Sequence, residues 1–144
     1  MAKLILDMSA MQEDFFAEAA MIGIVTALPG YRLCWLLNRH FDIEFCREPD
    51  QVIPLQKKEN KYHFPIYQFC LPNSSHKYLL YKLKDGKEPL LPETKQLDYL
   101  WLVQTANPEN DAENIVAELK KIADIQLARV LAQDQLKSLS NLIV

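Results

Sequence analysis

The chain has 144 residues, of which 49% are hydrophobic and 24% charged, with a formal net charge of −3. These values predict one globular domain over residues 1–144 and exclude a disordered or repetitive protein. No apolar run approaches the roughly 20 residues of a membrane helix, and the first apolar stretch is too short for a secretory signal. We therefore expect a cytoplasmic protein.

Residues 3–8 alternate briefly and predict a short strand. Residues 14–20 favour helix by propensity, whereas residues 21–26 are β-branched and run into the turn signal Pro29-Gly30. We predict that residues 21–26 form a strand.

Residues 31–41 place their apolar side chains on one helical face (Leu33, Cys34, Leu37 and Phe41), which predicts an amphipathic helix packed on a sheet. Residues 43–47 then predict a strand. Residues 48–60 hold two prolines and a charged cluster, so we expect a linker there.

Residues 62–71 and 77–84 are two aromatic-rich strand candidates around a loop rich in turn residues, which predicts a β-hairpin. Pro65 lies inside the first strand and cannot donate a ladder hydrogen bond. We therefore expect this strand to be an edge strand or to carry a bulge.

Residues 97–103 are apolar on both faces from Tyr99 onward, which is typical of a central strand covered on both sides. A helical stripe follows (Ala112, Ile115, Val116, Leu119 and Ile122), with Asn110 and Glu113 spaced as a capping box. Residues 125–132 predict a second strand, and residues 133–144 about one helical turn. The fold class is α+β: a mostly antiparallel twisted sheet, two main amphipathic helices on one face, and a C-terminal β-α-β unit.

The sequence LPETKQLDY at residues 91–99 resembles the signature that names the IPExxVDY family, a group of uncharacterised bacterial proteins. Gly23-Ile24 ahead of residues 31–38, and the segment at residues 136–143, are also similar to that family. The chain departs from the signature at two residues, Leu91 and Leu97, and has three residues between Glu93 and Leu97 where the signature has two. The resemblance implies a bacterial protein and carries no reaction with it.

The signature residues, which are Leu91, Pro92, Glu93, Leu97, Asp98 and Tyr99, have two interpretations. In the structural one, Pro92 ends the preceding segment, the Asp98 carboxylate accepts hydrogen bonds from loop amides, and the Tyr99 hydroxyl anchors a neighbouring helix. In the functional one, Glu93 and Asp98 form a paired-carboxylate site. We favour the structural interpretation.

Cysteines and histidines do not form a recognisable site. The three cysteines, Cys34, Cys46 and Cys70, are odd in number, widely spaced and set in apolar sequence, so we expect buried, reduced thiols. The three histidines, His40, His63 and His76, have no closely spaced ligand partner. Only three glycines are available for a phosphate-binding loop. We assign no catalytic, cofactor-binding or metal-binding residue.

Residues 57–87 hold seven lysines against two acids, a local balance of +5, so the remainder carries −8. On the second hairpin strand, alternation separates Leu79, Tyr81 and Leu83 from a mixed face, which is our candidate interaction surface: Tyr78, Leu80, Lys82 and Lys84. We expect this face either to form a homodimer contact or to lie under a loop. We do not expect nucleic-acid binding at physiological salt, because the chain is acidic overall and the region has no arginine.

These observations favour a non-catalytic protein that works by binding or homo-oligomerisation. The first alternative is a small hydrolase or transferase that uses scattered acids such as Glu93 and Asp98. The second is a weak nucleic-acid binder that uses the lysine- and tyrosine-rich hairpin.

Overall fold

The computed structural model describes residues 19–57, 60–72, 76–85, 88–91, 94 and 96–132. Their elements in chain order are β1 (Ala19–Thr26), α2 (Gly30–Phe41), β2 (Cys46–Lys57), β3 (Asn60–Cys70), β4 (Lys77–Lys82), β5 (Lys84–Asp85), β6 (Glu88–Pro89), β7 (Tyr99–Gln104), α3 (Pro108–Leu119) and β8 (Ile125–Leu131). Residues 3–18 and 133–144 lie outside the described residues, and with them the predicted first strand, most of the segment that favours helix, and the predicted last turn. The helix preference is wrong for Ala19 and Ala20, which belong to β1.

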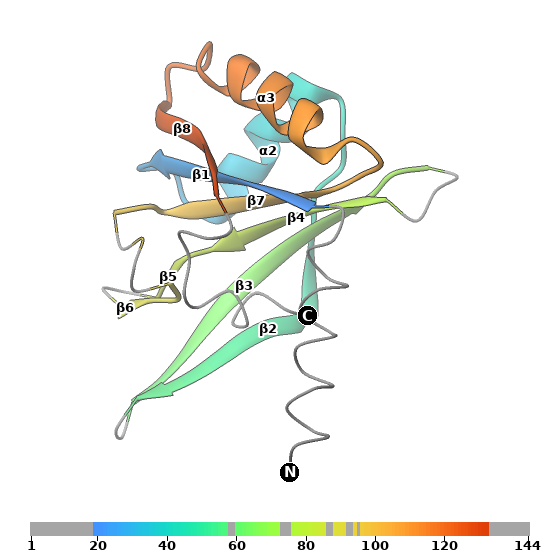
Figure 1. Cartoon of the computed structure of the whole chain (residues 1–144). Helices are drawn as coiled ribbons and strands as arrows, with labels where there is room; N and C mark the ends of the chain where they lie inside the picture. The colour runs from blue at the N-terminus through green and yellow to red at the C-terminus, as the bar shows by residue number, and fades with distance from the viewer. Residues whose placement is uncertain are drawn as a thin grey trace.

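Six strands form one twisted sheet in the order β2-β3-β4-β7-β1-β8, and every neighbouring pair is antiparallel. β5 and β6 form a separate two-stranded ribbon. Both α2 and α3 cover the same face of the large sheet (Figure 1). The α+β prediction is therefore confirmed. β7, α3 and β8 also form the predicted β-α-β unit, in which β1 lies between the two parallel strands.

The sheet has an apolar core on each face because its central strands alternate between two apolar sets. On β7, Tyr99, Trp101 and Val103 face the helices, whereas Leu100 and Leu102 face the opposite side, where Leu83, Leu90, Leu91 and Leu97 also pack. All five of these β7 side chains are at most 2% exposed. Each large side chain buried in this way stabilises the fold by roughly 1.5–3 kcal/mol, so β7 is the central strand that the sequence predicts.

The two helices begin and end for different reasons. α2 buries Leu33, Cys34 and Leu37 and ends at Phe41. The left-handed φ of 55° at Asp42 then lets the Ile43 N–H donate to the Asn38 carbonyl. α3 begins earlier than its predicted capping box, because Pro108 occupies the first helical position and its missing N–H costs nothing there. Asn110 therefore lies inside α3, and the predicted capping box is wrong.

The linker predicted over residues 48–60 is also wrong. β2 begins at Cys46, three residues later than the predicted strand, and continues through this segment to Lys57. β2 pairs only with β3, so its two prolines occupy an edge strand, the position in which a sheet tolerates proline. The pairing of β2 with β3 shifts register between Arg47 and Val52.

The Pro65 prediction is half correct. β3 is not an edge strand, because it pairs with β2 on one side and β4 on the other. Pro65 lies opposite Val52, where the irregular part of the β2 pairing ends, and the pairing with β4 begins one residue later at Ile66. The sheet therefore places the residue without an N–H beside an irregularity.

Candidate functional site

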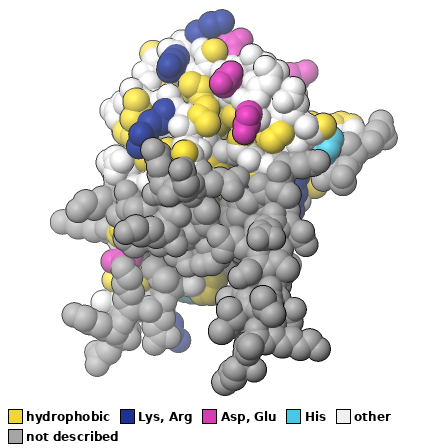
Figure 2. Space-filling view, viewed as in Figure 1, with side chains coloured by type: hydrophobic (Ala, Val, Ile, Leu, Met, Phe, Trp, Pro, Cys, Tyr) yellow, Lys and Arg dark blue, Asp and Glu magenta, His cyan; other side chains and the backbone are white. Residues whose placement is uncertain are grey.

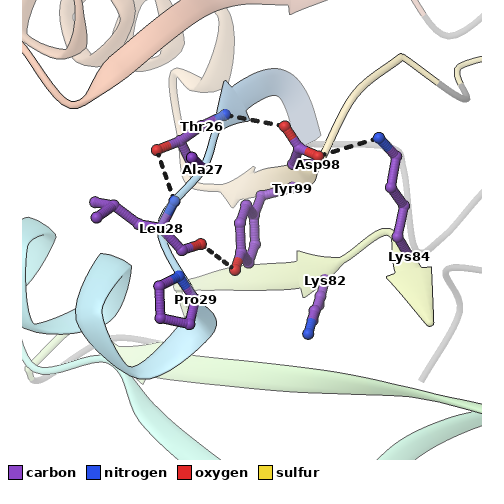
Figure 3. Close-up of a pocket in the computed structure, with 8 residues that line it drawn as sticks. All are labelled: Thr26, Ala27, Leu28, Pro29, Lys82, Lys84, Asp98 and Tyr99. Atoms are coloured by element: carbon purple, nitrogen blue, oxygen red, sulfur yellow. Dashed lines mark hydrogen bonds and ion pairs between the residues drawn. The ribbon is translucent and has the colours of Figure 1, made fainter. Parts of the chain in front are cut away.

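A pocket of about 410 Å³ opens where three strands of the sheet end together. Because β7 is antiparallel to both β1 and β4, the start of β7 lies beside the ends of the other two strands. The pocket lining is Thr26, Ala27, Leu28, Pro29, Lys82, Lys84, Asp98 and Tyr99. Figure 3 shows these side chains around the connection from β1 to α2. The pocket thus joins the end of the predicted signature to the two lysines of the predicted interaction surface.

Asp98 precedes β7 and makes hydrogen bonds to residues at the ends of β1 and β4. Its Oδ2 accepts a hydrogen bond from the Thr26 backbone N–H at 3.0 Å, and its Oδ1 lies 3.1 Å from the Lys84 Nζ (Figure 3). Its backbone N–H donates to the Ile24 carbonyl, and its own carbonyl accepts from the Leu83 N–H. Both oxygens of the carboxylate are therefore engaged, as the structural interpretation of the signature requires.

Tyr99 holds the connection between β1 and α2. Its hydroxyl donates a hydrogen bond to the Leu28 carbonyl at 2.9 Å, two residues before α2 begins (Figure 3). Burial is the main reason that the pKa of Tyr99 lies well above its usual value. The hydroxyl therefore remains a protonated donor at neutral pH.

Sequence analysis did not identify Thr26 as a pocket residue. Its Oγ1 donates to the Asp124 carbonyl at 2.7 Å and accepts from the Leu28 N–H at 3.3 Å. A threonine hydroxyl that accepts a hydrogen bond from the backbone N–H two residues later forms a recognised turn, and here the turn leads directly into Pro29-Gly30. That pattern was the available signal for a specific loop geometry at the pocket.

The described lining of the pocket carries more positive than negative charge, because it contains two lysines and one carboxylate. Lys84 is paired with Asp98, and the two side chains are 32% and 26% exposed. Lys82 is half-buried on the pocket wall, and among the described residues it has no ion-pair partner. The first turn of α2, which follows Pro29, contains no acidic residue and has no side-chain cap. The pocket surface is thus suited to a negatively charged group.

Of the remaining signature residues, those that the structure describes do not line this pocket. Leu91 and Leu97 are buried in the core on the face opposite the helices. Pro92 and Glu93 lie outside the residues that the structure describes. Among the described lining residues, Asp98 is the one carboxylate, so the predicted pairing of Glu93 with Asp98 stays a hypothesis.

The predicted interaction surface is divided by the fold. Leu80 is fully buried in the core beneath the helices. Tyr78 packs against Trp101, with ring centroids 5.4 Å apart, and against Phe45 of the α2–β2 connection. Leu80 is therefore closed to a partner and Tyr78 is partly buried in the aromatic cluster, while Lys82 and Lys84 line the pocket.

The cysteine prediction is correct for one thiol and wrong for two. Cys34 is buried on α2, and burial raises its pKa to about 12. Cys46 and Cys70 are exposed because they lie at the first residue of an edge strand and the last residue of β3.

Metal ligands do not gather in the described part of the chain. Within the described ranges no three His, Cys, Asp or Glu residues group as metal ligands. The His40 Nε2 lies 3.7 Å from the Glu118 Oε2, and His63 is exposed.

In the described part of the chain, no helix combines the length and apolar character that crossing a membrane requires. The sequence matches no protein-family model and no curated protein. The resemblance to the IPExxVDY signature accordingly stays a prediction, and the functional argument rests on the pocket.

Proposed function

We propose that the chain is a non-catalytic binding protein and that the pocket beside α2 receives a small anionic group, such as a carboxylate or a phosphate. The observation that carries the proposal is Lys82, a half-buried residue that lines the pocket and has no ion-pair partner among the described residues. A second ammonium group, on Lys84, lines the same pocket, and one carboxylate is present to balance the two. An anion bound there would supply the missing counter-charge.

The contacts of Asp98 and Tyr99 support binding rather than catalysis. A general base needs a free lone pair directed at the substrate. Each Asp98 oxygen already accepts one hydrogen bond within the protein, which directs the carboxylate at Thr26 and Lys84 even though each oxygen keeps a second lone pair, and the Tyr99 hydroxyl donates to Leu28. These contacts weigh against the alternative of a hydrolase or transferase that uses Asp98.

The burial of the hairpin tyrosines weighs against a nucleic-acid binder. Bases stack on exposed aromatic faces. Tyr81 is fully buried, and Tyr67 is only 9% exposed. Tyr78 is packed into the aromatic cluster around Trp101. The hairpin therefore offers lysines but few aromatic platforms.

We also propose a cytoplasmic location, because all three cysteines are free. Disulfides are common in oxidising compartments, whereas the cytosol keeps thiols reduced. The homodimer expected from sequence also remains a proposal. We propose that its contact lies on a face other than the predicted interaction surface of Tyr78, Leu80, Lys82 and Lys84.

The pocket proposal is tested by titrating the ¹⁵N-labelled chain separately with inorganic phosphate and with acetate, while recording amide chemical shifts. We expect saturable shifts at Thr26, Ala27 and Leu28, with a dissociation constant at or below about 1 mM. Lys82→Gln should weaken binding by at least about tenfold. The matched control is Lys61→Gln, which removes an exposed lysine on β3 that does not line the pocket.

Absence of saturable shifts with both anions up to about 10 mM would refute the proposal, because affinity that weak is less than one site-specific contact should provide. Equal weakening by Lys61→Gln would also refute it, because the shifts would then report general charge screening.

A further inference from the structure

The outer surface of α2 is aromatic and cationic. We call Tyr31, Arg32, Trp35 and Arg39 the α2 ridge; Tyr31 and Trp35 are 72% and 56% exposed. The Arg39 guanidinium lies over the Trp35 ring, 4.9 Å from its centroid. No acidic residue occurs between Gly30 and Phe41. Trp, Tyr and Arg are the residues enriched at the energetic centres of protein interfaces.

The outer surface of α3 has the opposite charge. We call Glu109 and Glu113 the α3 ridge, because they are exposed and one helical turn apart. Neither has an ion-pair partner among the described residues, and like charges at this spacing repel. Figure 2 shows acidic side chains in magenta on the face of the molecule that carries α3. The α3 ridge therefore lacks the cations that its charge would favour.

The two ridges belong to one continuous helical layer. His40 of α2 lies 3.7 Å from Glu118 of α3, so the helices are direct neighbours. A shallow hollow of about 310 Å³, lined by Trp35, Leu36, Arg39, His40 and Ile122, opens on this layer. Helical spacing places Glu109 and Glu113 on the flank of α3 opposite to Glu118, which contacts α2. A partner that covers the whole layer would therefore meet the cationic aromatic ridge and the hollow on α2 and the acidic ridge on the far flank of α3.

We propose that the occupant of this layer is a second copy of the same chain. A two-fold dimer brings each patch against its complement twice, so the α2 ridge of one copy would face the α3 ridge of the other at two equivalent places. The opposite charges of the ridges match that arrangement. Burial of Tyr31 and Trp35 supplies apolar area that these side chains leave open in the single chain.

A charge-exchange experiment in the full chain tests this contact. We expect the wild type to dimerise in sedimentation velocity at concentrations up to about 1 mM, and to dissociate as salt is added. Arg32→Glu with Arg39→Glu should raise the dissociation constant by at least about tenfold, because both contacts become acid against acid. Glu109→Lys with Glu113→Lys should have the same effect for the opposite reason.

The decisive measurement mixes the two variants. In a mixed dimer the reversed α2 ridge meets the reversed α3 ridge, and the two unchanged ridges meet each other, so heterodimers should form at near wild-type affinity. The control is Arg129→Glu, which reverses an exposed charge on β8 outside both ridges and should leave dimerisation unchanged. Far-ultraviolet circular dichroism shows whether each variant folds.

The proposal is overturned if the wild type remains monomeric at about 1 mM, a concentration at which even a weak specific contact is populated. It is also overturned if either ridge variant dimerises as the wild type does, or if the folded variants fail to combine. Phosphate titrations of the ridge variants separate the two proposals. If the ridges hold only the dimer together, a variant that no longer dimerises still shows the phosphate-induced shifts at Thr26, Ala27 and Leu28.

Discussion

Replacement of Asp98 by alanine should lower the stability of the protein more than an exposed ion pair would suggest. The substitution removes the acceptor of the Thr26 N–H and leaves that donor part-buried without a partner. A hydrogen bond to a charged group contributes about 1.5–3 kcal/mol. The Lys84 contact adds about 0–1 kcal/mol, because both side chains are about a third exposed and water screens them. We therefore expect a loss of about 1.5–4 kcal/mol.

Chemical and thermal unfolding measure this loss. For a domain near this size, each kcal/mol shifts the melting temperature by about 2–4 °C, so Asp98→Ala should lower it by about 3–16 °C. Lys84→Met, which removes only the ion pair, should change stability by less than about 1 kcal/mol. Asp98→Asn keeps an acceptor for Thr26 and should fall between the two.

The interpretation is wrong if Asp98→Ala unfolds within about 0.5 kcal/mol of the wild type, the range of an ordinary surface substitution. It is also wrong if Lys84→Met costs as much as Asp98→Ala, because the ion pair and not the Thr26 hydrogen bond would then dominate.

Gly30→Ala should destabilise the fold by about 1–3 kcal/mol, because its Cβ would meet the Tyr67 hydroxyl and lie 2.9 Å from the Tyr67 Cζ. In a Tyr67→Phe background the same substitution should cost less, and an alanine that stabilises the chain would contradict this packing. A thiol reagent at neutral pH should label the exposed Cys46 and Cys70 quickly and Cys34 slowly, with labelling counted by mass spectrometry. Because burial raises the pKa of Cys34 to about 12, a pH change from 7 to about 9 should leave its labelling slow, and three fast thiols would refute its burial.

The sequence predicts those parts of the fold whose hydrophobic periodicity is long and unambiguous. β7 is apolar on both faces, and the α2 stripe is regular, so both were predicted close to their observed bounds. Only the first two residues of β2 fall within a predicted strand, because Pro49 and Pro54 mark a loop when only local signals are used. Its strand conformation depends on pairing with β3, which is a tertiary effect that overrides local propensity.

The pocket was less predictable than the fold. Asp98 and Tyr99 were recognised with structural roles, but Thr26 is 72 residues from Asp98 in sequence. Lys82 and Lys84 were grouped with Tyr78 and Leu80 by alternation along one strand. Alternation identifies the face on which a residue lies, but it does not show where α2 covers that face and where the cover ends. Both facts require the sheet order and the helix position.

The interior position of β1, between β7 and β8, has a consequence during synthesis. Ile24 pairs with Tyr99, and Gly23 pairs with Arg129, so both partners of this early strand are made late. At about 5–20 residues per second, β1 waits about 4–15 s for β7 and longer for β8. During that time an apolar, β-branched segment has two unpaired edges, the condition that favours aggregation. A nascent chain arrested before residue 99 should therefore be bound by chaperones on the ribosome, and release should coincide with the emergence of β7.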